Sequence, residues 1–309
     1  MRPPTPAPDG ARVAGERPVH CPAVRILVTG AGGQVGARVV EALGPYDVLG
    51  VAHDALDLAD REQLEQVVAE FGPDAVVNCA AMTNVDACEL DPERAFAVNA
   101  LGVRSLAVAT ARRGAHLVHI STDYVFDGTA SRPYDEWDAV HPLSEYGRSK
   151  LGGEVEVAAH AGSWATIRTS WVFGRRGTDL VSWAFGAFDR GELDGVLADQ
   201  VSIPTFAPDL AVLLARFAVE RRQGLFHVTS GSEAVTRHEL IVTALRARGL
   251  DPSGVAPLDA ADLDRPAARP PMSALDNRAL RLAGLPGLRP WRDAVTDYVK
   301  DWDAPGSDA

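Results

Sequence analysis

The chain has 309 residues, of which 46% are hydrophobic and 23% charged, a composition that is ordinary for a globular protein of one or two domains. The formal net charge of −12 disfavours a nucleic-acid-binding protein, because phosphate backbones bind to basic surfaces. Three cysteines are too few for a disulfide framework, so we expect free thiols and a reducing, cytoplasmic location.

Residues 1–23 are rich in proline and contain no apolar run. We therefore expect a disordered tail there, with neither a secretory signal nor a membrane span. No later segment is apolar over enough residues to cross a bilayer, so we expect no membrane partner.

From residue 24 onward, short β-branched runs alternate with segments of helical periodicity. Strands are predicted at 24–30, 47–52, 74–81, 115–121 and 163–170. Helices are predicted within 31–43, from Asp60 to about 71, from Asp91-Pro92 to about Arg113, and from about 145 to Ala161. This repeated alternation predicts an α/β fold of the Rossmann type, with a doubly wound parallel sheet and helices on both faces.

After residue 170 the alternation becomes irregular. Helices are predicted at 178–190, 207–222, 236–248, 276–283 and 290–302, with a strand at 226–230 and a loop at 251–275. We expect a dinucleotide-binding domain over 24–170. Residues 171–309 would form mainly a smaller substrate-binding lid, with about 206–230 returning to the sheet.

A glycine-rich turn joins the first predicted strand to the first predicted helix. It contains the candidate cofactor-binding residues Gly30, Gly32, Gly33, Gln34, Val35 and Gly36. Glycine lets a pyrophosphate approach the helix N-terminus, whose free N–H groups and dipole stabilise the anion. The turn therefore predicts a dinucleotide site, and the alternative is a flexible strand–helix connection.

The second predicted strand ends where such folds usually carry an acid that binds the adenine ribose. Here Ala52 and His53 occupy that position, and Asp54 comes after it. Loss of the carboxylate admits a 2′-phosphate, which favours NADPH, with NADH as the alternative. Asp57 and Leu58 are expected near the adenine, or else they are a turn acid and a core leucine.

Tyr146 and Lys150 are four residues apart on a predicted helix, so they share one face. A nearby ammonium and an oxidised nicotinamide would both favour the phenolate and lower the pKa of Tyr146 from about 10. Thr122, at the carboxyl end of the fourth predicted strand, would orient the reacting oxygen. The alternatives are ordinary turn chemistry at Thr122 and a chance Tyr–Lys spacing.

Ordered motifs between about residues 24 and 302 make the chain resemble the extended short-chain dehydrogenase/reductases, and within them the dTDP-4-dehydrorhamnose reductase family. The motifs include TGAGGQVG (29–36), NCAAMTNVDACE (78–89), STDYVFDG (121–128), YGRSKLGGE (146–154), RTSWVFG (168–174) and RPPMSALD (269–276). The resemblance implies that Thr122, Tyr146 and Lys150 are catalytic. The implied reaction is reduction of the 4-keto group of a nucleotide-linked 4-keto-6-deoxy sugar.

The resemblance also implies binding residues. Those for the cofactor, besides the glycine turn, are Asp57, Leu58, Ala80, Ala81, Thr83, Asn99, Tyr146 and Lys150. Those for the substrate are Asp123, Tyr124, Trp171 and Arg269, where a core aromatic and a surface arginine are the alternatives for the last two. Related dehydratases carry Glu at the position of Tyr124, so this residue favours ketone reduction over water elimination.

Two departures from the family pattern affect these expectations. Ser202 stands where glycine is usual, in a loop near the sugar. Arg38 stands where some relatives have an acid that binds magnesium between subunits, so we expect no metal and leave a homodimer open. Two alternatives to a reductase remain. One is a non-catalytic NADP-binding subunit like that of methionine adenosyltransferase, and the other is a sugar-nucleotide epimerase or dehydratase.

Overall fold

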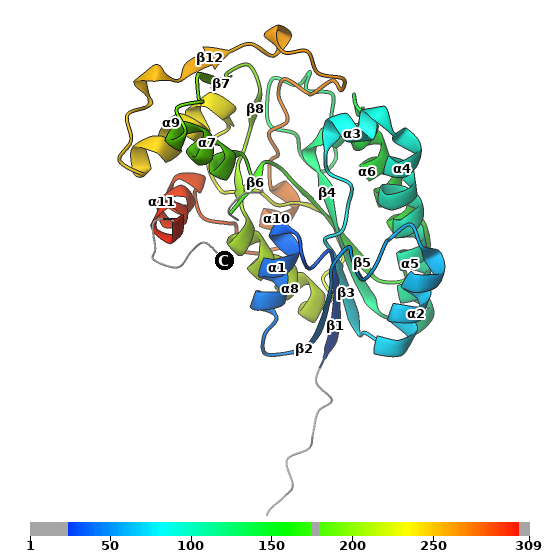
Figure 1. The fold of residues 1–309 in the computed structure, drawn as a ribbon. Coiled ribbons are helices and arrows are strands. Elements are labelled where there is room, and N and C mark those ends of the chain that lie inside the picture. The colour runs from blue at the N-terminus through cyan, green and yellow to red at the C-terminus, as the bar shows by residue number, and fades with distance from the viewer. Residues whose placement is uncertain (1–23, 175–178, 303–309) are drawn as a thin grey trace, which may run out of the picture.

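A computed structural model describes residues 24–174 and 179–302 of the chain. The tail predicted for residues 1–23 lies outside the described residues. A parallel sheet with the strand order β10-β5-β4-β3-β1-β2 forms the centre of the molecule (Figure 1). Its strands are β1 (Arg25–Thr29), β2 (Asp47–Val51), β3 (Ala75–Asn78), β4 (His116–Thr122), β5 (Trp164–Thr169) and β10 (Gly224–His227).

The strand order reverses at β1, which is the second strand from one edge of the sheet. From β1 the chain moves to β2 on one side, and it then continues through β3, β4 and β5 on the other. Ile26 of β1 accordingly pairs with Val48 of β2 and with Ala75 of β3. Ligands in open α/β sheets bind at the carboxyl ends of the strands, next to such a switch point. The predicted fold class is confirmed.

Helices cover both faces of the sheet (Figure 1). One face carries α2 (Arg61–Phe71), α5 (Val103–Arg113) and α6 (Glu145–His160), and the other carries α1 (Gln34–Ala42) and α8 (Ala207–Glu220). Ile26 and Val28 of β1 belong to one buried core, and Leu27 between them belongs to another. Both faces are therefore buried, which explains why this strand is apolar throughout rather than alternating.

The long helix predicted from Asp91-Pro92 is present, but it is not uniform. It consists of α4 (Pro92–Phe96), the π-helical segment η1 (Ala97–Gly102) and α5. Short π-helical segments often mark functional sites. Here the segment carries the buried Asn99 against α6, where a Cβ added to Gly153 would lie 2.3 Å from the Asn99 carbonyl oxygen. Glycine at 153 therefore allows the two helices to approach closely.

A second apolar core lies beside the carboxyl ends of the sheet strands and forms what we call the lid. It is built around Phe185 and Trp291 by α7 (Leu180–Asp189), α9 (Arg237–Ala247) and α11 (Trp291–Trp302). The helix predicted at 236–248 is present as α9, and a capping box begins it: Thr236 Oγ1 accepts a hydrogen bond from Glu239 N, and Glu239 Oε2 accepts one from Thr236 N. The domain boundaries themselves stay a prediction.

Short elements of the lid and its connections were not predicted. They are the strand pairs β6 (Val172–Phe173) with β9 (Thr205–Phe206), β7 (Gly195–Leu197) with β12 (Ala256–Leu258) and β8 (Val201–Ser202) with β11 (Val235–Thr236), the helix α3 (Val85–Leu90), and the 3-10 turns η2 (Asp123–Val125), η3 (Pro252–Gly254) and η4 (Ala260–Asp262). The helix predicted at 276–283 is present as α10 (Arg278–Leu282). The prediction of a plain loop over 251–275 is wrong at β12. These strands have only two or three residues, which is too short for a period-two pattern to show.

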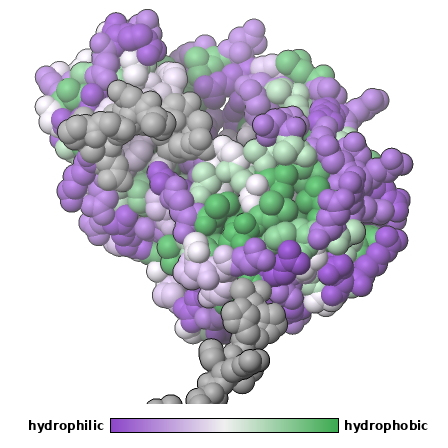
Figure 2. Space-filling view, turned by 60° about the horizontal axis from the view of Figure 1, so that its bottom comes forward, coloured by the Kyte–Doolittle hydropathy of each residue, from purple (hydrophilic) through white to green (hydrophobic). Residues whose placement is uncertain are grey.

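Figure 2 views the molecule from the side of the amino ends of the sheet strands and shows a hydrophobic area bordered by hydrophilic residues. Among the exposed large apolar side chains are Tyr46, after α1, and Val212, on α8. Among the helices that the structure describes, none combines the length and apolar character that a bilayer span requires.

Candidate active site

The glycine turn between β1 and α1 forms a cradle that larger residues would fill. Gly30 has φ +69°, and a Cβ added there would lie 2.6 Å from Ala80 N. A Cβ added to Gly36 would lie 2.1 Å from Gly30 O. Gly33 is the N-cap of α1 and provides no side-chain cap, and the first turn contains no acid. Helix N–H groups next to the switch point fit a pyrophosphate.

The segment after β3 faces this cradle across the switch point and contains Ala80, Ala81 and Thr83. Its backbone is held by Asn99, which receives a hydrogen bond from Met82 N at 2.9 Å and donates one to Met82 O at 3.0 Å. The same amide nitrogen lies 3.0 Å from Ser149 Oγ on α6. Asn99 is fully buried, so it positions the lining of the cradle. A direct contact between Asn99 and a cofactor stays a prediction.

The side chains of the residues predicted near the adenine contact other parts of the protein. Asp57 pairs with Arg94 at 2.7 Å and accepts a hydrogen bond from Ala59 N at 3.0 Å. Leu58 is 3% exposed and packs in the core beside α2. His53 is exposed at the end of β2. The side chains of Asp57 and Leu58 therefore match the turn-acid and core-leucine alternatives, and their contact with a cofactor stays a prediction.

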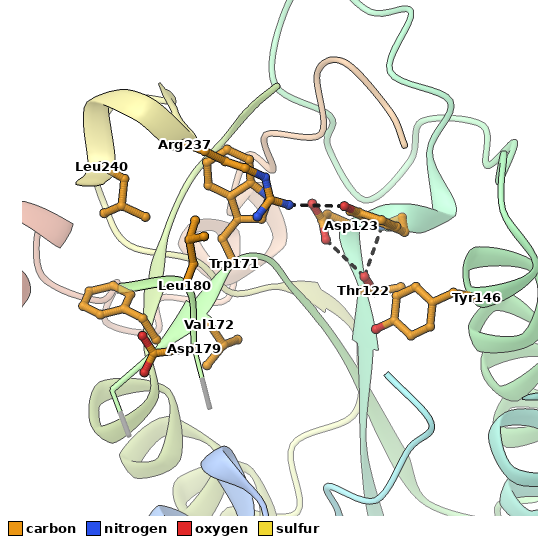
Figure 3. Close-up of a pocket in the computed structure, with 11 residues that line it drawn as sticks. Thr122, Asp123, Tyr146, Trp171, Val172, Asp179, Leu180, Arg237 and Leu240 are labelled. Carbon is orange, nitrogen blue, oxygen red and sulfur yellow. Dashed lines mark hydrogen bonds between the residues drawn. The ribbon is translucent and has the colours of Figure 1, made fainter. Parts of the chain in front are cut away.

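Thr122 and Tyr146 meet at the carboxyl end of β4, where the first turn of α6 approaches (Figure 3). Thr122 Oγ1 donates a hydrogen bond to Asp123 Oδ1 at 3.1 Å and accepts one from Tyr124 N at 3.2 Å. The Tyr146 phenol faces the Thr122 hydroxyl, which is close enough to influence the pKa of Tyr146. A Cβ added to Gly147 would lie 2.2 Å from Tyr124 O, so glycine at this position lets the helix come close.

Lys150 lies one turn further along α6 and is 3% exposed. Its Nζ donates a hydrogen bond to Ile120 O at 2.6 Å, and burial lowers the pKa of Lys150 to about 8, against the opposing effect of Glu154. Burial raises the pKa of Tyr146 above its usual value, and the opposing effect of the Thr122 hydroxyl does not offset this. The expected lowering of the Tyr146 pKa is therefore wrong for the polypeptide. The phenol is protonated at neutral pH, which is the form that can donate a proton.

A pocket of about 260 Å³ lies between this group and the lid (Figure 3). Trp171 lines it with φ +39°, a backbone conformation that is rare for a bulky residue and often found at ligand sites. The Tyr124 and Tyr146 rings meet edge to face, with centroids 5.8 Å apart. The pocket is lined by Thr122, Asp123, Tyr124, Tyr146, Trp171, Val172, Phe173, Asp179, Leu180, Arg237 and Leu240.

Six of these lining residues are missing from the sequence-based site: Val172, Phe173, Asp179, Leu180, Arg237 and Leu240. Val172 and Phe173 belong to the RTSWVFG motif, and Asp179 and Leu180 follow it in the chain. The motif was therefore a signal that this part of the chain reaches the pocket. The only local signal for Arg237 was the capping box that begins α9, and a helix start does not indicate what its first side chain faces.

Asp123 lies behind Thr122 and is 2% exposed. Its Oδ2 accepts hydrogen bonds from Ser273 Oγ and, at 3.4 Å, from Ser202 Oγ. Burial raises the pKa of Asp123 to about 6, although the hydrogen bonds from Ser273 and Thr122 act in the opposite direction. The serine that departs from the family glycine at 202 thus reaches Asp123. These contacts orient the Thr122 hydroxyl, whose single proton is directed to the carboxylate.

Arg269 is bound to Asp86 rather than to the pocket. Its two terminal nitrogens lie 2.9 and 2.6 Å from the two Asp86 carboxylate oxygens, and one of them also donates a hydrogen bond to Ala267 O at 2.7 Å. Arg269 is not among the lining residues of the pocket. Contact with a substrate therefore stays a prediction for Arg269.

The arrangement can transfer a proton to a carbonyl oxygen that lies next to Tyr146. A glycine cradle fitted to a dinucleotide, a protonated phenol and a buried amine lie around one end of the sheet. In the part of the chain that the structure describes, no three His, Cys, Asp or Glu side chains are grouped to hold a metal ion.

Comparisons with known proteins give consistent matches over nearly the whole described chain. Residues 24–304 match the family model described as the RmlD substrate binding domain. The dTDP-4-dehydrorhamnose reductase of Burkholderia thailandensis is 40% identical over 296 residues, which covers 90% of this chain and 99% of that protein. The dTDP-4-keto-6-deoxy-D-glucose reductase of Streptomyces niveus is 37% identical over 275 residues, with coverages of 88% and 95%.

The fold matches solved structures equally closely. The crystal structure of dTDP-4-dehydrorhamnose reductase from Bacillus anthracis in complex with NADP has a TM-score of 0.87 and 32% sequence identity. This match covers 90% of the present chain and 99% of the other.

Proposed function

The chain belongs to the RmlD substrate binding domain family, and on this premise we propose that it reduces the 4-keto group of a dTDP-linked 4-keto-6-deoxyhexose with NADPH. The observation that carries the proposal is the placement of the Thr122 hydroxyl and the Tyr146 phenol side by side on the pocket wall, beside the buried Lys150. Relatives named as reductases of such sugars, at 40% and 37% identity, support the reaction type.

The residues of the glycine cradle fit the cofactor. The N–H groups at the start of α1 would hold the pyrophosphate, and Ala80, Ala81 and Thr83 would line the opposite side. Lys150 would bind the ribose hydroxyls next to the nicotinamide. The chemistry that NADPH supplies there is a hydride for carbon 4 of the sugar. Ala52 and His53, in place of a ribose-binding acid, support the phosphorylated cofactor.

Tyr146 provides the proton that balances the hydride. Its raised pKa keeps the phenol protonated until the carbonyl oxygen becomes basic, and the O–H bond then breaks as the new alcohol O–H bond forms. General-acid help of this kind is worth roughly 10²–10⁴-fold in rate. The Lys150 ammonium stabilises the resulting phenolate by its charge. Thr122, fixed by Asp123, directs the Tyr146 hydroxyl.

The chain contains free thiols at Cys79 and Cys88, which supports a reducing compartment. We place the reaction in the cytoplasm on this basis. Burial raises the pKa of Cys79 to about 12, which keeps this thiol unreactive.

The reaction is tested with the purified full chain, NADPH and two substrates: dTDP-4-keto-6-deoxyglucose and its epimerised form. Loss of the reduced-nicotinamide absorbance with either sugar, and a product whose configuration at carbon 4 is read by NMR, supports the proposal. The matched control replaces Tyr146 with Phe. Absence of oxidation with both sugars, together with tight NADPH binding, would contradict the reductase and favour a non-catalytic NADP-binding subunit.

A further inference from the structure

Arg237 lines the pocket, and its charge and that of Arg269 act on Arg265. The three arginines differ in how their charge is balanced. Arg269 is neutralised by its two-point contact with Asp86. Within residues 24–174 and 179–302, no carboxylate oxygen lies within 4.0 Å of the side-chain nitrogens of Arg237 or Arg265. Arg237 lines the pocket, whereas Arg265 is exposed on the loop that follows η4.

The Arg237 guanidinium is fixed in place by uncharged groups. Its Nε donates a hydrogen bond to Gln200 Oε1 at 3.0 Å, and its central carbon lies 4.6 Å from the centroid of the Trp171 ring. One terminal nitrogen donates a hydrogen bond to the Tyr124 hydroxyl at 3.4 Å. A guanidinium held by one edge and stacked on a ring keeps its other N–H groups available for an oxyanion.

The same region carries a local excess of positive charge. The pKa of Arg265 is lowered by burial and by the neighbouring guanidinium groups of Arg269 and Arg237, and Asp86 opposes this effect. The guanidinium groups of Arg237 and Arg269 thus act on Arg265, while Asp86 pairs with Arg269 and the buried Asp123 lies close enough to Arg237 for the guanidinium to lower its pKa. In a chain with a net charge of −12, such a cluster at a pocket edge favours an anionic ligand.

We propose that Arg237, assisted by Arg265, binds the diphosphate of the nucleotide-sugar substrate, and that Arg269 instead holds the adjoining loop to Asp86. This inference rests on the proposed function. A ketone next to Thr122 and Tyr146 occupies the sheet side of the pocket, so the diphosphate of the same molecule extends toward the lid side, where Arg237 and Trp171 lie (Figure 3). The planar fork of arginine suits two phosphate oxygens.

The test is a calorimetric titration of the NADPH-saturated full chain with dTDP and, separately, with thymidine, which lacks the phosphates. Arg237→Gln is expected to weaken dTDP binding at least tenfold, which corresponds to about 1.4 kcal/mol, and to leave thymidine binding unchanged. Arg265→Gln is expected to weaken dTDP binding less, because this side chain is exposed. The matched control Arg292→Gln removes an arginine on α11 that pairs with Glu233, and it should change neither titration.

Equal dTDP affinity in Arg237→Gln and the unaltered chain would overturn the inference. The same conclusion would follow if the unaltered chain bound dTDP no better than thymidine, or if Arg269→Gln changed the dTDP-to-thymidine affinity ratio as much as Arg237→Gln. If Arg237→Gln does not fold, Arg237→Lys, which keeps the charge but loses the fork, should show an intermediate ratio. Oxidation of NADPH is measured separately. If the chain binds dTDP through Arg237 but oxidises no NADPH, the result contradicts only the proposed function.

Discussion

Lys150 Nζ lies 2.6 Å from the carbonyl oxygen of Ile120, two residues before Thr122 on the same strand. This bond ties helix α6, which carries Tyr146, to the strand that presents the Thr122 hydroxyl. The amine is thereby fixed below the site, while the Tyr146 phenol at the start of the helix meets Thr122. The strand and the helix together set the distance between proton donor and amine.

Replacing Tyr146 with Phe removes the proposed proton donor and keeps the ring. We expect kcat to fall by about 10²–10⁴-fold, because general-acid help is lost. The dissociation constant of NADPH should change little, as measured by fluorescence titration. A variant that keeps its full turnover would remove Tyr146 from the mechanism.

The pKa of Lys150 predicts the alkaline limb of the pH profile. Burial lowers this pKa to about 8, so the ammonium is present below that pH and is lost above it. Because kcat/KM reports the ionisation of the free enzyme, it should decline above about pH 8. Steady-state rates across this range, with protein stability checked at each pH, provide the measurement. In Lys150→Arg, whose guanidinium stays charged, the limb should move to higher pH or vanish, and an unchanged limb would assign it to another group.

The pKa of Asp123 predicts where kcat/KM falls on the acid side of the pH profile. Its pKa is raised to about 6 by burial, so protonation below that pH removes the carboxylate that accepts the Thr122 proton. We expect kcat/KM to fall below about pH 6 in the unaltered chain. Asp123→Asn should show a lower kcat at neutral pH and lose this limb. If the variant keeps the same acid limb as the unaltered chain, Asp123 does not cause it.

The sequence predicted the local geometry correctly where the candidate site residues are close together in the chain. The glycine turn and the Tyr146–Lys150 spacing are local patterns, so their element types determine their geometry. Arg237 was missed because its contact with Tyr124 joins residues that are 113 positions apart. The direction of the Tyr146 pKa shift was wrong for a related reason. Burial by the folded chain dominates that shift, and a sequence spacing does not measure burial.

The substrate residues show the same limit. Trp171 was expected near the sugar and does line the pocket, because it directly follows a strand of the central sheet. Arg269 was expected at the nucleotide, but it pairs with Asp86, a residue 183 positions away. The sequence gives no local sign of this partner. The position of a charged side chain in a motif therefore predicts its partner poorly, whereas the position of a glycine predicts the backbone turn well.

Gly36→Ala should weaken cofactor binding, in protein whose folded state is confirmed by circular dichroism. The added Cβ would lie 2.1 Å from Gly30 O, so the turn must open and the cradle for the pyrophosphate is distorted. Fluorescence titration should show an NADPH dissociation constant raised at least about tenfold, equal to about 1.4 kcal/mol. Gly162→Ala is the matched control, because nothing lies within 4 Å of a Cβ added there. Equal NADPH affinity in the two variants would mean that the turn does not hold the cofactor.

The buried pair of Arg168 and Glu154 predicts a large effect on stability. The two side chains are 4% and 9% exposed, and Arg168 contacts both carboxylate oxygens, at 2.8 and 2.7 Å. Arg168→Met leaves the Glu154 carboxylate buried without its counter-charge, although the Ser121 hydroxyl still donates a hydrogen bond to it. Breaking a buried pair in this way costs about 3–5 kcal/mol in the free energy of unfolding.

The matched control for this pair is Arg61→Met, which breaks the exposed pair between Arg61 and Glu65 on α2. Exposed pairs contribute about 0–1 kcal/mol, because water screens the charges. Urea denaturation of both variants gives the comparison. Glu154 lies one helical turn after Lys150, so loosening this pair should also reduce turnover at temperatures where the variant is still folded. Similar unfolding free energies for the two variants would show that the buried pair does not fix α6 to the sheet.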